Sequence, residues 1–408
     1  MTSTAALPSA HRASPGVADR WRRLPQWGRA ALVYAASRLV TTLLFLWVGA
    51  QATTASRAGA NPSLIDLGRA WDGEWYWLIS VNGYPAHLPL TATGAVDTNS
   101  WAFLPLWPYL VKVVSFGVVA AWPPVAMLLA TVFGCGAAVL LAVLLRPHIG
   151  AERAGFAVAV FAFSPLSFVL QTAYAESLGL FLLLAALCLV DRRRYLAAVP
   201  VTIALAFTRP LALPLALAVG LHLALRLVAA ARGGPAVPRR EVAWGIVLAA
   251  VAAAAGVAWS GIAALVTGVP DAYFLTEQAW RALWMPGASF AYFTPWLFAA
   301  NFWLGPVAGP VLLTVVILGF ALLLVSRPVR RVGSLARLWS ASYALYLLAV
   351  FFPQSSLFRL LMPLAPLAGA LVPRSVPARV AVLCVSVALQ ALWMWCTYGP
   401  FQAFWSVP

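Results

Sequence analysis

Apolar runs of about 20 residues recur along the whole chain, and an apolar helix of that length spans the hydrocarbon core of a bilayer. The chain has 408 residues, of which 63% are hydrophobic and only 9% are charged. An ordinary soluble domain does not have this composition. The sequence therefore predicts an all-α, polytopic membrane protein, with a single integral membrane domain over residues 28–408.

About eleven of these runs are expected to cross the membrane. Several are short, which is tolerated only where protein surrounds them or where they line a water-filled cavity. The first run carries Arg38 in its middle and is expected to be an uncleaved signal anchor, with Arg38 in a structural role facing the bundle interior. The expected spans cover residues 28–51, 122–145, 154–172, 177–190, 196–207, 211–228, 242–266, 296–325, 338–352, 360–371 and 380–397.

The charged residues between the spans predict the orientation. With the N-terminus inside, the inner loops hold 20 basic and 4 acidic residues, and the outer segments hold 6 basic and 7 acidic residues. This bias is the positive-inside pattern, so the net charge of +16 indicates membrane orientation and not a nucleic-acid partner. We expect an N-in, C-out protein, with a disordered cytoplasmic basic tail over 1–27 and an extracytoplasmic loop over 52–121. In this sorting, residues 101–115 do not cross but form an interfacial helix.

The first outer loop contains the segment WDGEWYWLISVNGYP, which places Asp72 and Glu74 among several aromatic residues. One interpretation is structural: Asp72 caps a short interfacial helix, and Glu74 lies in its first turn. The other is catalytic: a carboxylate in a partly apolar setting is the general base that deprotonates an acceptor hydroxyl during sugar transfer. In a helix, Asp72 shares a face with Trp75 and Tyr76, whereas Glu74 points away and is a secondary candidate.

Aromatic rings suit a sugar site because they stack on the apolar faces of a pyranose ring, although they are also typical of a membrane-interface belt. His87 also has a structural alternative, because a single histidine in a loop is often only solvated. The candidate sugar or acceptor contacts are Trp71, Trp75, Tyr76, Tyr84 and His87.

A lipid-phosphate donor needs cations near the same membrane face. The candidates are Arg359 and Arg209, at the predicted outer ends of short spans, and Arg281 in an outer loop. Each has a structural alternative, as a side chain that reaches the lipid headgroups or as a loop surface residue. Glu176, at the predicted outer end of its span, either caps that helix or lies in the cavity as a second carboxylate. The sequence has no metal-ligand pattern, so we expect neither a metal nor a cofactor.

Several segments occur in a fixed order along residues 28–370: WDGEWYWLISVNGYP followed by NSWAFLPLWPYLVKVV, then TAYAESLGLFLLLAAL, ALAFTRPLALPLAL, LTEQAWRALW and LFRLLMPLAPL. Together they resemble the signature segments of the PIG-V family, the GPI mannosyltransferase 2-like proteins. Leu104 and Trp107 replace the Phe and Tyr of the family's Phe-Pro-Leu-Tyr-Pro element, a departure that bears on the acceptor more than on the chemistry. The composition, rich in arginine and alanine, is typical of a bacterial member, for which a GPI precursor is not expected as the acceptor.

The resemblance implies a GT-C type bundle with interfacial helices in the first outer loop. It also implies inverting, metal-independent transfer of mannose from polyprenyl-phosphate mannose at the outer face of the plasma membrane. Carried over by position, Asp72 would be the base, Arg359 and Arg209 would be phosphate-side residues, and Glu176 has no assigned role. The implied partners are the lipid-linked sugar, membrane lipid and an acceptor glycolipid or glycan. The competing class is a non-catalytic membrane protein, either a glycolipid transporter or a scaffold.

Overall fold

The computed structural model describes residues 21, 23–283, 285, 287 and 290–400. These residues are entirely helical apart from loops and one isolated β-bridge between Leu90 and Val96, and no strand occurs among them. The predicted all-α architecture is confirmed. Residues 1–20 and 22 of the expected basic tail lie outside the described residues.

Six helices of the described chain are long enough and apolar enough to cross a membrane. Their 20 to 31 residues correspond to about 30–46 Å of helix. They agree with the expected membrane protein class, and each coincides with one of the expected spans. They are α2 (Gln26–Gly49), α6 (Trp122–Ile149), α10 (Ala212–Ala231), α11 (Arg239–Thr267), α13 (Pro295–Val325) and α17 (Val376–Tyr398).

Shorter α-helices lie in four of the five other expected spans. They have 12 to 17 residues, which gives about 18–26 Å of helix, less than the roughly 30 Å hydrocarbon core. A count of eleven crossings therefore stays a prediction. These helices are α7 (Ala151–Ala162), α8 (Glu176–Asp191), α9 (Tyr195–Ala206) and α15 (Ser334–Val350).

Prolines divide two segments that were expected to be continuous spans. The helix expected over 154–172 ends at Ala162, before Pro165, and the chain continues as the 3₁₀ segment η3 (Ser167–Gln171). Residues 360–371 do not form a regular α-helix. Their place is taken by α16 (Leu357–Leu360) and by the nine-residue 3₁₀ segment η4 (Met362–Ala370), which contains two prolines. Proline lacks the N–H that a continuous helix requires, and η4 extends only about 18 Å.

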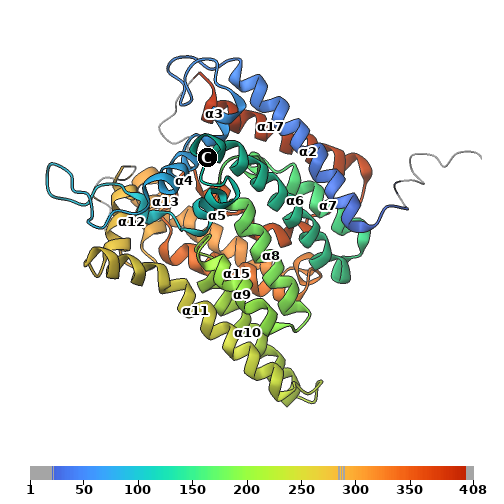
Figure 1. Cartoon of the computed structure of the whole chain (residues 1–408). Coiled ribbons are helices and arrows are strands. Elements are labelled where there is room, and N and C mark those ends of the chain that lie inside the picture. The colour runs from blue at the N-terminus through green and yellow to red at the C-terminus, as the bar shows by residue number, and fades with distance from the viewer. Residues whose placement is uncertain (1–20, 22, 284, 286, 288–289, 401–408) are drawn as a thin grey trace, which may run out of the picture.

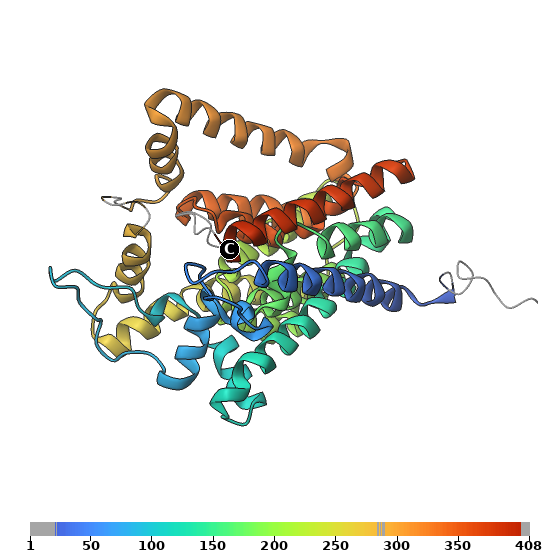
Figure 2. The ribbon, with the colours of Figure 1, turned by 90° about the horizontal axis from the view of Figure 1, so that it is seen from above.

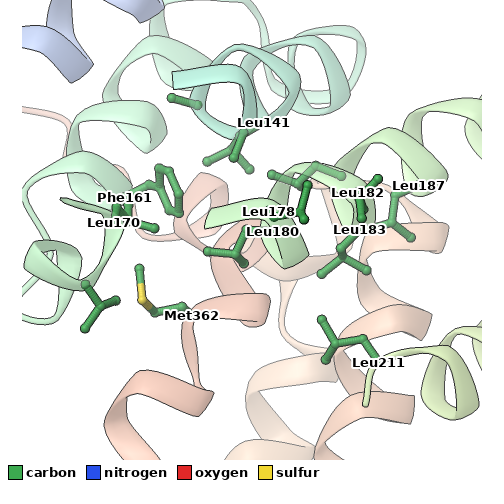
Figure 3. Packing of buried hydrophobic residues seen from close by; sticks show 14 of the residues in the cluster. Leu141, Phe161, Leu170, Leu178, Leu180, Leu182, Leu183, Leu187, Leu211 and Met362 are labelled. Carbon is green, nitrogen blue, oxygen red and sulfur yellow. The ribbon is translucent and has the colours of Figure 1, made fainter. Parts of the chain in front are cut away.

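The core is built around α8, of which 12 of the 16 residues are buried. This helix is apolar on all sides, as expected for a helix surrounded by protein. It packs mainly against α6 and α9. Figure 3 shows part of the core, with Leu178, Leu180, Leu183 and Leu187 of α8, Leu141 of α6, Phe161 of α7 and Met362 of η4.

Arg38 lies inside the bundle, as predicted. It is buried, and its guanidinium donates hydrogen bonds to the carbonyl oxygens of Ser167, at 2.6 Å, and Ala162, at 2.8 Å. These carbonyls lie where α7 ends and η3 begins, and carbonyls at a helix end lack intrahelical partners. Arg38 is therefore structural, because it satisfies the backbone at the break between α7 and η3.

The long helix α13 runs along one edge of the molecule, apart from the central helices (Figure 2). Only three of its residues are buried: Pro295, Ala299 and Gly309. Its backbone is interrupted at Gly305, where φ is 79° and ψ is 171°, before Pro306. The helices α10 and α11 pack against each other and project from the bundle at the bottom of Figure 1.

Short helices cover one end of the bundle. They are α3 (Leu64–Arg69), α4 (Asp72–Asn82), η1 (Ser100–Ala102), α5 (Leu106–Val114), η2 (Val119–Ala121) and α12 (Ala272–Ala282), and α14 (Arg327–Arg330) lies elsewhere, after α13. With nine residues, α5 is only about 14 Å long. The segment expected not to cross is therefore too short to do so, and its interfacial position stays a prediction. Figure 1 shows α4 and α5 side by side.

Candidate functional site

Four charged side chains from distant parts of the chain meet inside the molecule, and we call them the charge cluster: Asp72, Glu176, Arg209 and Arg359. Arg359 Nη1 donates to Asp72 Oδ2 at 2.6 Å, and Arg359 Nε lies 3.1 Å from Glu176 Oε1. Arg209 Nη2 lies 3.2 Å from the same Glu176 oxygen. The two carboxylates and two guanidiniums balance in formal charge, and each carboxylate contacts at least one guanidinium.

Both carboxylates of the charge cluster lie at the starts of helices. Asp72 is the first residue of α4, and Glu176 is the first residue of α8. The amino end of a helix carries a partial positive charge, so it favours a carboxylate there. The capping interpretation is nevertheless wrong for both, because the N-cap positions are Trp71 and Ala175 and the two carboxylates bind arginines instead.

Trp71 adopts a strained backbone conformation directly before Asp72, with φ of 63° and ψ of −122°. A bulky residue rarely has a positive φ, and such outliers cost about 1–3 kcal/mol. This turn separates α3 from α4 and makes Asp72 the first helical residue. Strain of this kind is concentrated at functional sites, which favours a role for Asp72 beyond packing.

Both arginines of the charge cluster lie where a helix is interrupted. Arg209 follows the end of α9 at Ala206 and precedes Pro210, and a residue before proline is disfavoured in helical conformation. Arg359 lies in the short α16, shortly before Pro363. Their side chains are only 15% and 7% exposed, respectively, so neither reaches out to lipid headgroups.

Two glycines permit the close packing around the charge cluster. A Cβ at Gly179 would lie 2.8 Å from Arg209 Cγ, so the absence of a side chain lets Arg209 pass α8 one turn beyond Glu176. A Cβ at Gly73 would lie 3.2 Å from the Cβ of Ala173 and from the carbonyl oxygen of Gly68. The first turn of α4 can therefore approach the loop that leads into Glu176.

The environment keeps the arginines charged and the neighbouring phenol neutral. Burial lowers the pKa of Arg359, but the carboxylates of Asp72 and Glu176 outweigh it, so the net shift is upward. The pKa of Arg209 is likewise raised, because Glu176 and other neighbours outweigh its burial. Burial raises the pKa of Tyr76, with Arg209 opposing the shift, so Tyr76 stays protonated at physiological pH.

Tyrosines complete the surroundings of the charge cluster, and only Tyr76 was singled out from the sequence. The guanidinium of Arg359 lies over the ring of Tyr174, 5.3 Å from its centroid, and Tyr174 donates to the carbonyl oxygen of Ala70. Tyr343 donates to the carbonyl oxygen of Leu360 and so holds the segment that carries Arg359. Tyr174 lies two residues before Glu176, and this closeness in the sequence could have identified it as a neighbour of the site. Tyr343 lies in an apolar helix without such a signal.

Glu74 and Arg281 lie in separate ion pairs. Glu74 pairs with Arg57 at 3.1 Å on the surface, which confirms that it points away from the Asp72 face. Arg281 pairs with Glu277 at 3.0 Å, one turn earlier in α12, and lies over the ring of Phe352. Arg281 is therefore a partly buried, paired residue of the neighbouring helix and not a solvated loop side chain.

Of the residues predicted to contact a sugar or acceptor, some pack against other aromatic rings and one is exposed. Trp75 stacks on Phe103 with 5.8 Å between ring centroids, and Trp280 meets Trp75 edge-on at 5.0 Å. Tyr84 donates to the carbonyl oxygen of Phe103 and packs in a second hydrophobic cluster. His87 is exposed in the following loop.

Trp71 contacts Arg57, whose guanidinium lies 4.9 Å from its ring centroid. Five residues were predicted to contact a sugar or acceptor. Among the described residues, only Tyr76 of these five interacts with members of the charge cluster. Contacts of Trp71, Trp75, Tyr84 and His87 with a sugar stay predictions.

Within the described part of the chain, no three His, Cys, Asp or Glu side chains gather as a metal site would require. No protein-family model matches the chain, and no curated protein sequence matches it. The site is therefore defined by its geometry: a buried, charge-balanced cluster in which Asp72 is the most exposed member.

Proposed function

We propose that the chain is an inverting, GT-C type mannosyltransferase similar to the PIG-V family. It would move mannose from polyprenyl-phosphate mannose to the hydroxyl of a lipid- or envelope-linked acceptor. The observation that supports this proposal is the charge cluster itself. Its four residues were selected from four separate sequence segments, and Arg359 nevertheless meets Asp72 across 287 positions of the chain.

Burial of the cluster favours a functional over a purely stabilising role. Ion pairs removed from water lose hydration, and replacing them with apolar residues is often neutral or stabilising. Ionisable side chains inside a membrane protein are accordingly rare and mark substrate sites or proton pathways. A cluster of four such residues, with a strained turn at Asp72, is best explained by the chemistry that it performs.

Asp72 is the proposed general base. Arg359 binds Oδ2, and the carboxylate keeps 17% of its side-chain surface exposed. In the reaction, the acceptor oxygen attacks the anomeric carbon of mannose as Asp72 Oδ1 takes the hydroxyl proton. The new C–O bond forms while the bond to the phosphate oxygen breaks, and polyprenyl phosphate leaves with the bonding electrons. The configuration at the anomeric carbon is inverted.

The two arginines have different roles in this proposal. Arg359 is a positioning residue, because it holds Asp72 with Nη1 and Glu176 with Nε. The side chain of Arg209 is about twice as exposed as that of Arg359. Within the described chain, Glu176 is its only ion-pair partner. Arg209 is therefore the better ligand for the departing phosphate, whose negative charge it would stabilise. Glu176 holds both guanidiniums in place.

The donor class is tested with purified protein and an envelope lipid extract as the source of acceptor. We expect labelled mannose to move from polyprenyl-phosphate mannose, with little transfer from GDP-mannose or polyprenyl-phosphate glucose. Transfer only from the nucleotide sugar would contradict the proposal. A folded protein that transfers none of these sugars would favour the non-catalytic alternative, a transporter or scaffold in the same membrane.

The location of the site in the cell is part of the same proposal. The positive-inside pattern favours an N-in, C-out protein of the plasma membrane, which opens the charge cluster toward the extracytoplasmic face. A lipid-linked donor would then bring its phosphate to the ends of the helices, while its polyprenyl chain stays among the membrane lipids.

A further inference from the structure

A second polar site lies at the opposite end of the helices from the charge cluster. The helix α8 begins at Glu176 and ends at Asp191, so the residues that follow it lie about 22 Å farther along its axis. There, a pocket of about 550 Å³ opens between the start of α9 and the start of α11. Its lining includes Arg193, Arg194, Arg240 and Glu241.

The pocket carries an excess of positive charge. Its single acidic side chain, Glu241, is already bound by Arg226 at 2.8 Å and lies 3.9 Å from Arg193. Arg194 and Arg240 are exposed, and neither takes part in an ion pair among the described residues. Two guanidiniums at the rim of one pocket are therefore available to an anion, and guanidinium groups bind phosphate oxygens in pairs of hydrogen bonds.

Apolar side chains form the rest of the pocket. Leu196 is half exposed, and the partly buried indole of Trp244 also lines the pocket. Trp244 belongs to α11, which is long and apolar enough to span a membrane, and lies five residues after the start of that helix. A position so close to the end of a spanning helix corresponds to the depth of the lipid headgroups. A ligand with a charged head and an apolar tail matches both parts of the lining.

We propose that this pocket binds the phosphate headgroup of an anionic glycerophospholipid. Arg194 and Arg240 contact the phosphate, and Leu196 and Trp244 lie beside the first part of an acyl chain. Basic pockets between membrane-spanning helices recognise anionic lipids by this combination of charge and apolar surface. The lipid joins the starts of α9 and α11, and α9 leads directly into the turn that carries Arg209. The proposal is independent of mannosyl transfer.

The proposal is tested by lipid binding to the full chain in phosphatidylcholine nanodiscs, with phosphatidylglycerol as the added probe. The pocket variant is the double substitution Arg194→Ala/Arg240→Ala. The control is Arg327→Ala/Arg331→Ala, which removes the same charge from exposed arginines outside the pocket. We expect the dissociation constant for phosphatidylglycerol to rise at least about tenfold in the pocket variant, because two charge-assisted contacts are lost, and to change little in the control.

Three results would overturn the proposal. One is equal weakening in both double variants, which would indicate a general surface charge effect. Another is equal affinity of the wild type for phosphatidylglycerol and phosphatidylcholine. The third is competition by inorganic phosphate at the same concentration as the lipid, which would identify a free-anion site. Thermal unfolding of each variant without added lipid verifies that the substitutions leave the protein folded.

Discussion

At the charge cluster, the carboxylate of Glu176 is shared by two arginines, while Asp72 depends on one of them. Arg359 Nε and Arg209 Nη2 both approach Glu176 Oε1, at 3.1 and 3.2 Å. Removal of any one member leaves the buried cluster with one unbalanced charge, and an uncompensated buried charge is strongly destabilising. The four residues are therefore expected to respond to substitution as a unit.

This coupling is tested at Glu176 and Arg209. Glu176→Gln and Arg209→Gln should each lower the free energy of unfolding, because each leaves a charge buried and uncompensated. The double variant should be less destabilised than the sum of the two, with an interaction energy of about 0.5–3 kcal/mol. Thermal and denaturant unfolding of the purified proteins would measure the cycle, and strictly additive effects would show that the two side chains do not interact.

A substitution at Gly179 tests whether Arg209 needs the space left by the missing side chain. Gly179→Ala adds a methyl group 2.8 Å from Arg209 Cγ and should displace the guanidinium from Glu176. We expect mannosyl transfer to fall at least about tenfold, and the free energy of unfolding to fall less than in Arg209→Gln, because alanine favours helix over glycine by about 1 kcal/mol. The matched control is Gly220→Ala, a helical position with no atom within 4 Å of the added methyl. An equal loss of transfer in both variants would contradict the role given to Gly179.

Among the helices, the long ones could be predicted from the sequence, whereas the irregular segments could not. The six long helices follow from uninterrupted apolar sequence, and their observed bounds lie within a few residues of those expected. The segment expected as a span over 360–371 is also apolar, so hydropathy alone does not reveal that Met362–Ala370 forms a 3₁₀ segment. There, proline positions and burial against neighbouring helices decide the local structure.

The interruption in α13 makes a prediction about a single glycine. Gly305 has φ of 79° and ψ of 171°, a region open almost only to glycine. Gly305→Ala should therefore lower the free energy of unfolding by about 1–3 kcal/mol. Gly319→Ala, in the same helix and with no atom within 4 Å of the added methyl, is the control and should be neutral or slightly stabilising. Thermal unfolding in nanodiscs measures both, and equal melting temperatures would show that α13 is not held in the interrupted form.

At the scale of the whole molecule, the sequence predicted the members of the charge cluster but not their pairing. Asp72, Glu176, Arg209 and Arg359 were each chosen from a local segment. The bond between Asp72 and Arg359 depends on how α4, α8 and α16 fold together, and no local pattern encodes a contact across 287 positions. Tyr84 was likewise chosen from the local outer-loop segment, and the structure packs it against a second hydrophobic cluster.

The number of membrane crossings is a second property of the whole molecule that is open to test. Eleven crossings place the two termini on opposite sides, whereas six crossings by the long helices alone would place them on the same side. We expect an epitope tag at the C-terminus to be labelled in intact cells and one at the N-terminus only after permeabilisation. Labelling of both tags under the same condition would contradict an odd number of crossings and the N-in, C-out orientation.

The proposed reaction depends most directly on the Asp72 carboxylate. The decisive measurement compares transfer from polyprenyl-phosphate mannose by wild type, Asp72→Asn and Glu74→Gln. Loss of a general base lowers turnover by about 10²–10⁴-fold, so we expect that loss in Asp72→Asn, with donor binding retained. Glu74→Gln, which alters only a surface ion pair with Arg57, should transfer mannose like wild type. Equal turnover by Asp72→Asn and wild type would contradict the assignment of Asp72 as the base.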